Sequence, residues 1–110
     1  MTSDAPMRRI DTDLWSGLIR LHVLHHAAQD DLFGLGMIQE LRRHGYEISP
    51  GTLYPMLHGL ERRGYLKSRL KRGDRGSRRV YRITAEGRTA LGEARRRVQE
   101  LFHELFEEAP

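Results

Sequence analysis

The sequence predicts a mainly α-helical chain with a two-stranded β-wing, an α+β fold of the winged helix-turn-helix type that ends in a C-terminal dimerisation helix. Three segments with helical apolar spacing come first, a strongly basic hairpin follows, and the last segment repeats its apolar residues at alternating steps of three and four. A chain of 110 residues has room for one modest core. We therefore expect a flexible arm over residues 1–12, a winged domain over residues 13–84 and the dimerisation helix over residues 85–110.

The first predicted helix covers residues 13–28. Its apolar residues surround most of its circumference, which is expected of a helix that is buried on more than one side. They are Leu14, Trp15, Leu18, Ile19, Leu21, Val23 and Leu24. A second helix is expected over residues 35–44, with Ile38 and Leu41 facing inward and Gly45 as its stop signal.

Ser49 and Pro50 predict the start of the third helix, because serine is a common N-cap and proline suits the first helical position. The helix is expected to end near residue 63, before Gly64. Its predicted buried stripe consists of Leu53, Leu57 and Leu60. The opposite face carries no large apolar side chain, and its members are Gly51, Pro55, His58 and Arg62. In a winged fold the third helix reads DNA, so we expect this face to approach the bases.

Two strands are predicted over residues 65–70 and 78–83, joined by a glycine-containing loop over residues 71–77. Between residues 61 and 82 ten side chains are basic and two are acidic, an excess of +8 that exceeds the net charge of +4 of the whole chain. A solvated loop is the alternative, but such loops usually mix the two signs of charge. The asymmetry indicates a surface for a polyanion. The expected contacts come from Arg62, Lys71, Arg72, Arg75, Arg78 and Arg79.

The last helix is expected to begin after Thr84 as its cap and to reach about residue 108. Five apolar residues repeat along it with the spacing of a coiled-coil seam, and they are Leu91, Ala94, Val98, Leu101 and Leu105. Packing on the chain's own core is the alternative. The helix extends well past the predicted wing, however, and this length favours contact with a second copy.

Several classes of protein are excluded or disfavoured by what the sequence lacks. The absence of cysteine excludes disulfides, iron–sulfur clusters and thiolate metal sites. No apolar run approaches the roughly 20 residues of a membrane span, and no apolar signal-peptide core is visible, so we expect a cytoplasmic protein without a membrane partner. No nucleophile–base pair, phosphate loop or set of paired carboxylates is visible, so we expect neither an enzyme nor a required cofactor.

Two stretches resemble the signature sequences of the PadR family of bacterial transcriptional regulators. Residues 49–64 resemble its recognition helix, Gly-Thr-Leu-Tyr-Pro followed by Leu-x-x-Leu-Glu-x-x-Gly. Residues 76–87, Gly-Ser-Arg-Arg-Val-Tyr-Arg-Ile-Thr-Ala-Glu-Gly, are similar to its wing. The resemblance spans roughly residues 14–91. The chain departs from the family pattern at Gly34-Leu35, where Gly-Tyr is usual, and at Val80-Tyr81, where two aromatics are common.

The resemblance implies a homodimer of the short-tailed branch, which binds a palindromic operator in double-stranded DNA, represses nearby genes and is released by an effector. It implies DNA contacts by Thr52, Tyr54 and Pro55 of the recognition helix and by Arg78, Arg79 and Tyr81 of the wing. For Ser49 and His58 the position on the helix counts as much as the resemblance. The implied dimer interface combines Leu14, Trp15 and Leu18 of the first helix with Leu91, Ala94, Val98, Leu101, Phe102 and Leu105 of the last.

A histidine pair on the first helix leaves the nature of an effector open. His22 and His26 lie one turn apart, and Asp30 extends the same face by another turn. The two histidines are able to share a Zn²⁺-like ion, with a carboxylate or His103 of the partner subunit as a third ligand. The sequence favours the alternative, polar packing inside a dimer interface, because it fixes no third ligand. Trp15 is similarly either interface core or a stacking platform for a small planar inducer.

A rival function is that of a protein-interaction adaptor, in which the winged helix does not bind DNA and the last helix holds a protein partner. This hypothesis explains the heptad spacing of the last helix. It leaves the basic wing without a role, and for that reason DNA binding is the preferred interpretation.

Overall fold

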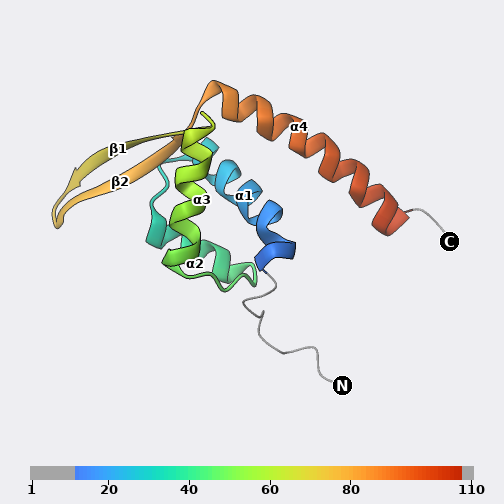
Figure 1. Cartoon of the computed structure of the whole chain (residues 1–110), viewed down its shortest axis with the longest axis horizontal. Helices are drawn as coiled ribbons and strands as arrows, with labels where there is room; N and C mark the ends of the chain where they lie inside the picture. The colour runs from blue at the N-terminus through green and yellow to red at the C-terminus, as the bar shows by residue number, and fades with distance from the viewer. Residues whose placement is uncertain (1–11, 108–110) are drawn as a thin grey trace, which may run out of the picture.

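The computed structural model describes residues 12–107 and confirms the predicted fold class, a winged helix-turn-helix with a long C-terminal helix (Figure 1). The elements are α1 (Thr12–Gln29), α2 (Gly34–Arg43), α3 (Pro50–Arg62), β1 (Leu66–Gly73), β2 (Gly76–Ile83), α4 (Ala85–Phe102) and the π-helical turn η2 (His103–Glu107). The predicted N-terminal arm lies almost entirely outside the described residues.

The core lies between α1, α2, α3 and the base of the wing. The predicted stripe of α3 is buried as expected, with Leu53 and Leu57 at 0% exposure and Leu60 at 3%. From α1 the core receives Ile19 and Val23, which are both fully buried. The apolar ring around α1 is thus divided, because part of it enters this core while other members remain at the surface.

Local signals position the ends of α3 and α4. Ser49 has the extended conformation of an N-cap, and the chain leaves α3 through Gly64, whose positive φ of 84° suits glycine. Thr84 caps α4 as predicted, because its hydroxyl oxygen accepts a hydrogen bond from the Gly87 amide at 2.9 Å. Arg88 in α4 then donates to the carbonyl of Ala28 near the end of α1, at 3.3 Å. These contacts fix the start of α4 against the winged domain.

The wing is longer and its loop shorter than the sequence suggested. β1 and β2 pair in antiparallel register from Leu66↔Ile83 to Gly73↔Gly76, so the predicted seven-residue loop is reduced to a tight turn. Ladder hydrogen bonds continue through residues that carry no apolar signal, and Gly76 supplies the positive φ of 104° that the turn requires. On its other edge β2 is joined by Leu32, which exchanges two backbone hydrogen bonds with Tyr81.

α4 extends away from the winged domain, and its C-terminal half is free of the rest of the chain (Figure 1). Several predicted interface residues are exposed in the single chain: Leu14, Leu18, Val98, Leu101, Phe102 and Leu105. Trp15 and Leu91, in contrast, are half-buried and pack against the protomer's own core, and Ala94 is also half-buried. Among the described residues, no helix combines the length and apolar character needed to cross a membrane.

Candidate nucleic-acid interface

The outward face of α3 is exposed and polar, as the sequence predicted. Gly51, Pro55, His58 and Arg62 are all exposed, opposite the buried leucines. At the N-terminal end the hydroxyl of Ser49 makes no capping bond to the helix and lies 3.3 Å from the hydroxyl of Thr52. Thr52 is half-buried. This end of α3 therefore presents two hydroxyl groups that are able to hydrogen-bond to base edges.

Tyr54 is placed at the edge of α3 with one side against the core. The ring is half-buried and packs on the hydrophobic cluster. Its hydroxyl end lies against Gly34 at the start of α2, where any side chain would collide with it. Packing against Tyr54 therefore requires glycine at position 34. Leu35, the next residue, lies at the surface and is 60% exposed.

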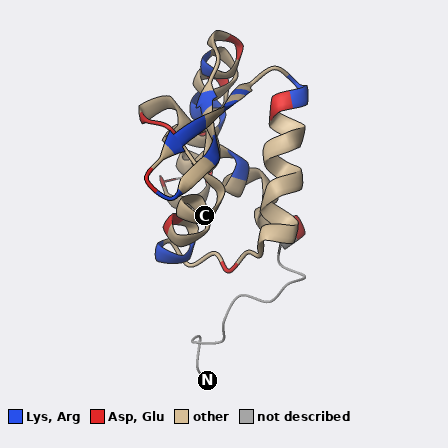
Figure 2. Cartoon of the chain, turned by 90° about the vertical axis from the view of Figure 1, so that its left-hand side faces the viewer, with Lys and Arg blue, Asp and Glu red and all other residues tan. Residues whose placement is uncertain are grey.

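Basic side chains are concentrated on the wing. Residues 66–83 include eight basic residues and a single acid, Asp74, which lies in the turn between the strands. Figure 2 shows these basic residues gathered on the hairpin, beside α3, which remains uncharged until its last turn. Arg72 and Arg75 are exposed near the tip, and no ion pair involves them within residues 12–107. A positive ribbon next to an uncharged helix face matches a surface that follows a phosphate backbone while the helix meets the bases.

The base of the wing is held by an acidic residue before α2. Asp31 accepts two hydrogen bonds from Arg69, at 3.2 and 3.0 Å, and one from Lys71 at 3.1 Å. The hydrogen bond from Arg69 and then that from Lys71 lower the pKa of Asp31 to about 2. Arg82 lies 3.7 Å from the same carboxylate. Lys71, predicted as a DNA contact, is therefore ion-paired within the protein, so a phosphate would have to compete with Asp31 for it.

Two further arginines of the wing are oriented by neighbours. The Arg78 guanidinium lies 4.2 Å from the centre of the Phe33 ring, in a cation–π contact. Arg79 donates to the hydroxyl of Ser68 at 3.0 Å, and that hydroxyl donates to Glu61 in α3 at 2.7 Å. Both arginines remain exposed. The wing is consequently connected to α3 on one face and to the α1–α2 segment on the other.

Tyr81 requires a correction. Its side chain is 1% exposed and belongs to the hydrophobic core, so it is not available for the DNA contact that the family resemblance implied. The preceding residue, Val80, is also buried at 2%. At this point the core covers one face of β2, and the backbone of Leu32 pairs with its outer edge. Burial also raises the pKa of the Tyr81 hydroxyl.

The histidine pair of α1 is brought together with a third histidine. His22 and His26 are half-buried, and the ring that joins them is His44 from the end of α2. Asp30 does not belong to this group. His103 of the same chain lies 2.7 Å from Glu107, within η2, and a contribution from His103 of the partner subunit stays a prediction.

The family is settled by comparison with known proteins. The model of the PadR-like family of transcriptional regulators matches residues 23–93, which covers α2, α3, the wing and parts of α1 and α4. The chain belongs to the PadR-like family. It is also 54% identical over 88 residues to "Transcriptional regulator Rv3488" of Mycobacterium tuberculosis, a match that covers 80% of this chain and 82% of that protein.

Solved structures agree on the fold of this PadR-like regulator. A PadR family transcriptional regulator from Eggerthella lenta has a TM-score of 0.75 at 29% identity, covering 91% of each chain. A PadR-like regulator from Bacillus cereus has a TM-score of 0.75 at 24% identity, covering 88% of this chain and 99% of that one. The protein is therefore a DNA-binding transcriptional regulator and not an enzyme.

Several residues of the interface escaped sequence reasoning. In the sequence Asp31 marks only a break after the first helix, yet in the fold it pairs with three cations of the wing. Phe33 and Ser68, which orient Arg78 and Arg79, carry no signal of their own. The only hint of these ion pairs in the sequence is the adjacent pair Asp30 and Asp31, whose charge is opposite to that of the basic wing. No spacing along the sequence connects residue 31 with residues 69 and 71.

Proposed function

We propose that this PadR-like regulator is a repressor that binds a palindromic operator as a homodimer and is released by an effector. One observation carries the proposal: an exposed polar face of α3 lies beside a wing whose arginines near the tip are free of ion pairs among the described residues. In this proposal α3 meets base edges through His58 and the Ser49–Thr52 end, while Arg72, Arg75, Arg78 and Arg79 contact the backbone.

Exposed apolar side chains on α1 and α4 support the homodimer. On α4, Val98, Leu101 and Leu105 are 43%, 50% and 65% exposed. A groove of about 980 Å³ runs between α1 and α4, and Leu18 and Phe102 contribute to its lining. Exposed apolar surface of this kind marks an interaction site in most proteins. A second copy supplies the same helices in return, which suits the two-fold symmetry of most homodimers.

Two-fold symmetry supports the palindromic operator. Two identical heads related by such an axis read inverted half-sites, with their centres about one or more helical turns apart. A dimer on such a site covers promoter DNA, which is the basis for proposing repression. Release by an effector would follow if a ligand in the α1–α4 groove, about one helical turn from Trp15, changed the angle between the two heads.

Fluorescence anisotropy with DNA from upstream of the protein's own gene tests this function. The control is a shuffled duplex of equal length and composition, titrated at the same salt concentration. We expect tighter binding to the upstream DNA by a factor of at least about 10³, because specific sites usually exceed non-specific DNA by that margin. Equal and weak binding to both duplexes would reject this proposal and leave the adaptor function in its place.

A further inference from the structure

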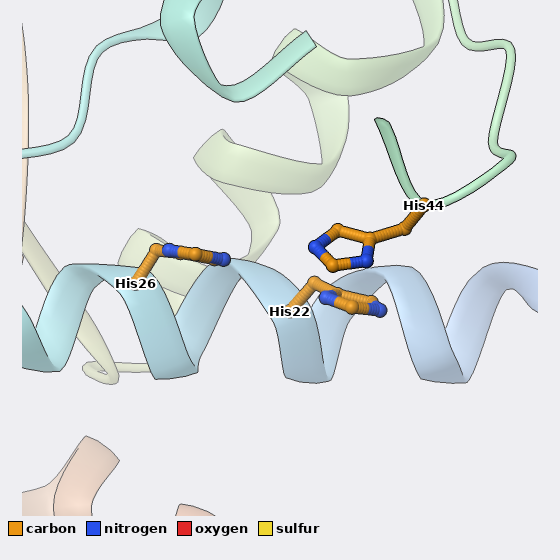
Figure 3. Close-up of side chains that lie close together, drawn as sticks. All are labelled: His22, His26 and His44. Carbon is orange, nitrogen blue, oxygen red and sulfur yellow. The ribbon is translucent and has the colours of Figure 1, made fainter. Parts of the chain in front are cut away.

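Three histidines meet between α1 and the end of α2, apart from the DNA-facing surface. His22 and His26 lie one turn apart on α1, and His44 reaches over α1 from the residue that follows α2 (Figure 3). One ring nitrogen from each side chain falls into a group whose atoms all lie within 4.8 Å of one another. The His22 and His44 rings have centroids 4.9 Å apart.

A carboxylate lies beside two of these rings and hydrogen-bonds to one of them. Glu40 Oε2 lies 3.0 Å from Nε2 of His44 and 3.6 Å from Nε2 of His26. Metal-binding histidines usually give their second ring nitrogen to such an acceptor, which fixes the tautomer and the orientation of the ring. Glu40 is well placed for this role, because it belongs to α2 and faces α1.

The protonation state of the cluster is also suitable. Burial is the main cause that lowers the pKa of His22, and the neighbouring imidazole of His44 lowers it further. Burial likewise lowers the pKa of His26, against the opposing effect of Glu40. Imidazoles must be neutral to bind a metal, so lowered values reduce the competition from protons.

We propose that His22, His26 and His44 form a binding site for a divalent transition-metal ion of the zinc type, with Glu40 positioning the rings and water completing the coordination. Imidazole ligands suit Zn²⁺, Ni²⁺ and Co²⁺, and the chain has no cysteine to favour softer ions. A tetrahedral site with Zn–N bonds of about 2.0–2.1 Å has nitrogens about 3.3 Å apart. The three ring nitrogens now lie up to 4.8 Å apart, so the side chains would rotate to bring them within this distance when an ion binds.

A metal ion at this site would connect two parts of the chain that are separate in sequence. His44 is followed by Gly45 and the short segment that leads to Ser49 and α3. A bound ion would tie α1, which belongs to the proposed dimer interface, to the turn before the recognition helix. The site goes beyond the proposed DNA-binding function and does not depend on it.

Metal binding is tested on the full-length, untagged protein after treatment with a chelator. Titration with Zn²⁺ should raise the melting temperature by about 10 °C when the free ion is about 100 times its Kd. Titration with Co²⁺ should produce visible absorption that saturates at one ion per chain. No stoichiometric binding of either ion by the unmodified protein would overturn the proposal.

Variants identify the ligands. His44→Ala is the decisive variant, because His44 is exposed and its removal leaves the core intact. We expect it to weaken Zn²⁺ binding by at least roughly 100-fold, and Glu40→Gln to weaken binding by roughly 10- to 100-fold. The matched control is His25→Ala, an exposed histidine of the same helix outside the cluster. Loss of binding in the control, or unchanged binding in His44→Ala, would contradict the assignment of His22, His26 and His44 as the ligands.

Discussion

Replacing Leu101 and Leu105 of α4 by glutamate should separate the proposed dimer while each protomer stays folded. The structure leaves 50% of Leu101 and 65% of Leu105 exposed, so neither side chain is needed for the protomer's own core. Full burial of a leucine contributes about 1.5–3 kcal/mol, so covering the exposed part of each should contribute about 1–1.5 kcal/mol. Four such side chains in a two-fold dimer then contribute about 4–6 kcal/mol.

That free energy corresponds to a dimer dissociation constant weaker by a factor of about 10³ to 10⁴, and the buried glutamates weaken the dimer further. Light scattering coupled to size exclusion, at micromolar protein, should show a monomer with a helical circular-dichroism spectrum like that of the unmodified protein. Leu35→Glu is the matched control, since Leu35 is 60% exposed on α2, which is not part of the proposed dimer interface. A double variant that remains a dimer would refute the role of α4, and α1 would have to carry the interface alone.

Two further predictions concern Asp31. Asp31→Asn should release Arg69 and Lys71, tighten binding to non-specific DNA and steepen its salt dependence by up to about 0.9 for each additional phosphate that the wing neutralises. Asp30→Asn is the control, because Asp30 is exposed, accepts a hydrogen bond from the Asp31 amide at 2.7 Å and reaches a single wing cation, Arg82, at 4.0 Å. Identical behaviour of the two variants would contradict the role of Asp31. The second prediction follows from the pKa of Asp31, which is lowered from 3.8 to about 2. The ion pairs stabilise the fold fully above about pH 4 and lose this effect as the pH falls toward 2. Thermal melts should therefore show a steeper acid loss in the unmodified protein than in Asp31→Asn, and parallel curves would count against it.

The order and type of the elements were accessible from the sequence because each left a local signal. The alternating three- and four-residue spacing of Leu53, Leu57 and Leu60 predicted the buried side of α3, and these residues are indeed buried. Thr84 was identified as a cap from its position before the last helix, and its hydroxyl makes that bond. Signals of this kind depend on neighbours within one turn, so a single sequence is sufficient to see them.

The wing was predicted less well because its strands do not alternate. Near the tip both faces are polar, so the period-two pattern that marks a strand is absent even though the ladder continues to Gly73 and Gly76. At the base, Val80 and Tyr81 are buried one after the other. A motif shared with a family did not reveal that Tyr81 belongs to the core, since a motif does not say which side of the strand faces the domain.

Tertiary neighbours were the least accessible. His44 completes the histidine cluster from a different helix, and Asp31 meets Arg69 across 38 positions of sequence. Neither pairing follows from spacing along one element. The sequence pointed to His22 and His26, with Asp30 or His103 of the partner subunit as a third ligand, and did not point to His44, which the path of the chain after α2 brings beside them.

The division of labour between α3 and the wing is tested most directly by the ratio of specific to non-specific DNA affinity at several salt concentrations. Arg72→Ala and Arg75→Ala together should weaken binding to both duplexes alike and flatten the salt dependence by about 0.9 for each phosphate that is no longer neutralised, leaving the ratio unchanged. Thr52→Val and His58→Ala together should lower operator affinity by about 1–3 kcal/mol per base contact and spare non-specific DNA, so the ratio falls. An equal fall of the ratio in both double variants would contradict the assignment of base reading to α3 and backbone contact to the wing.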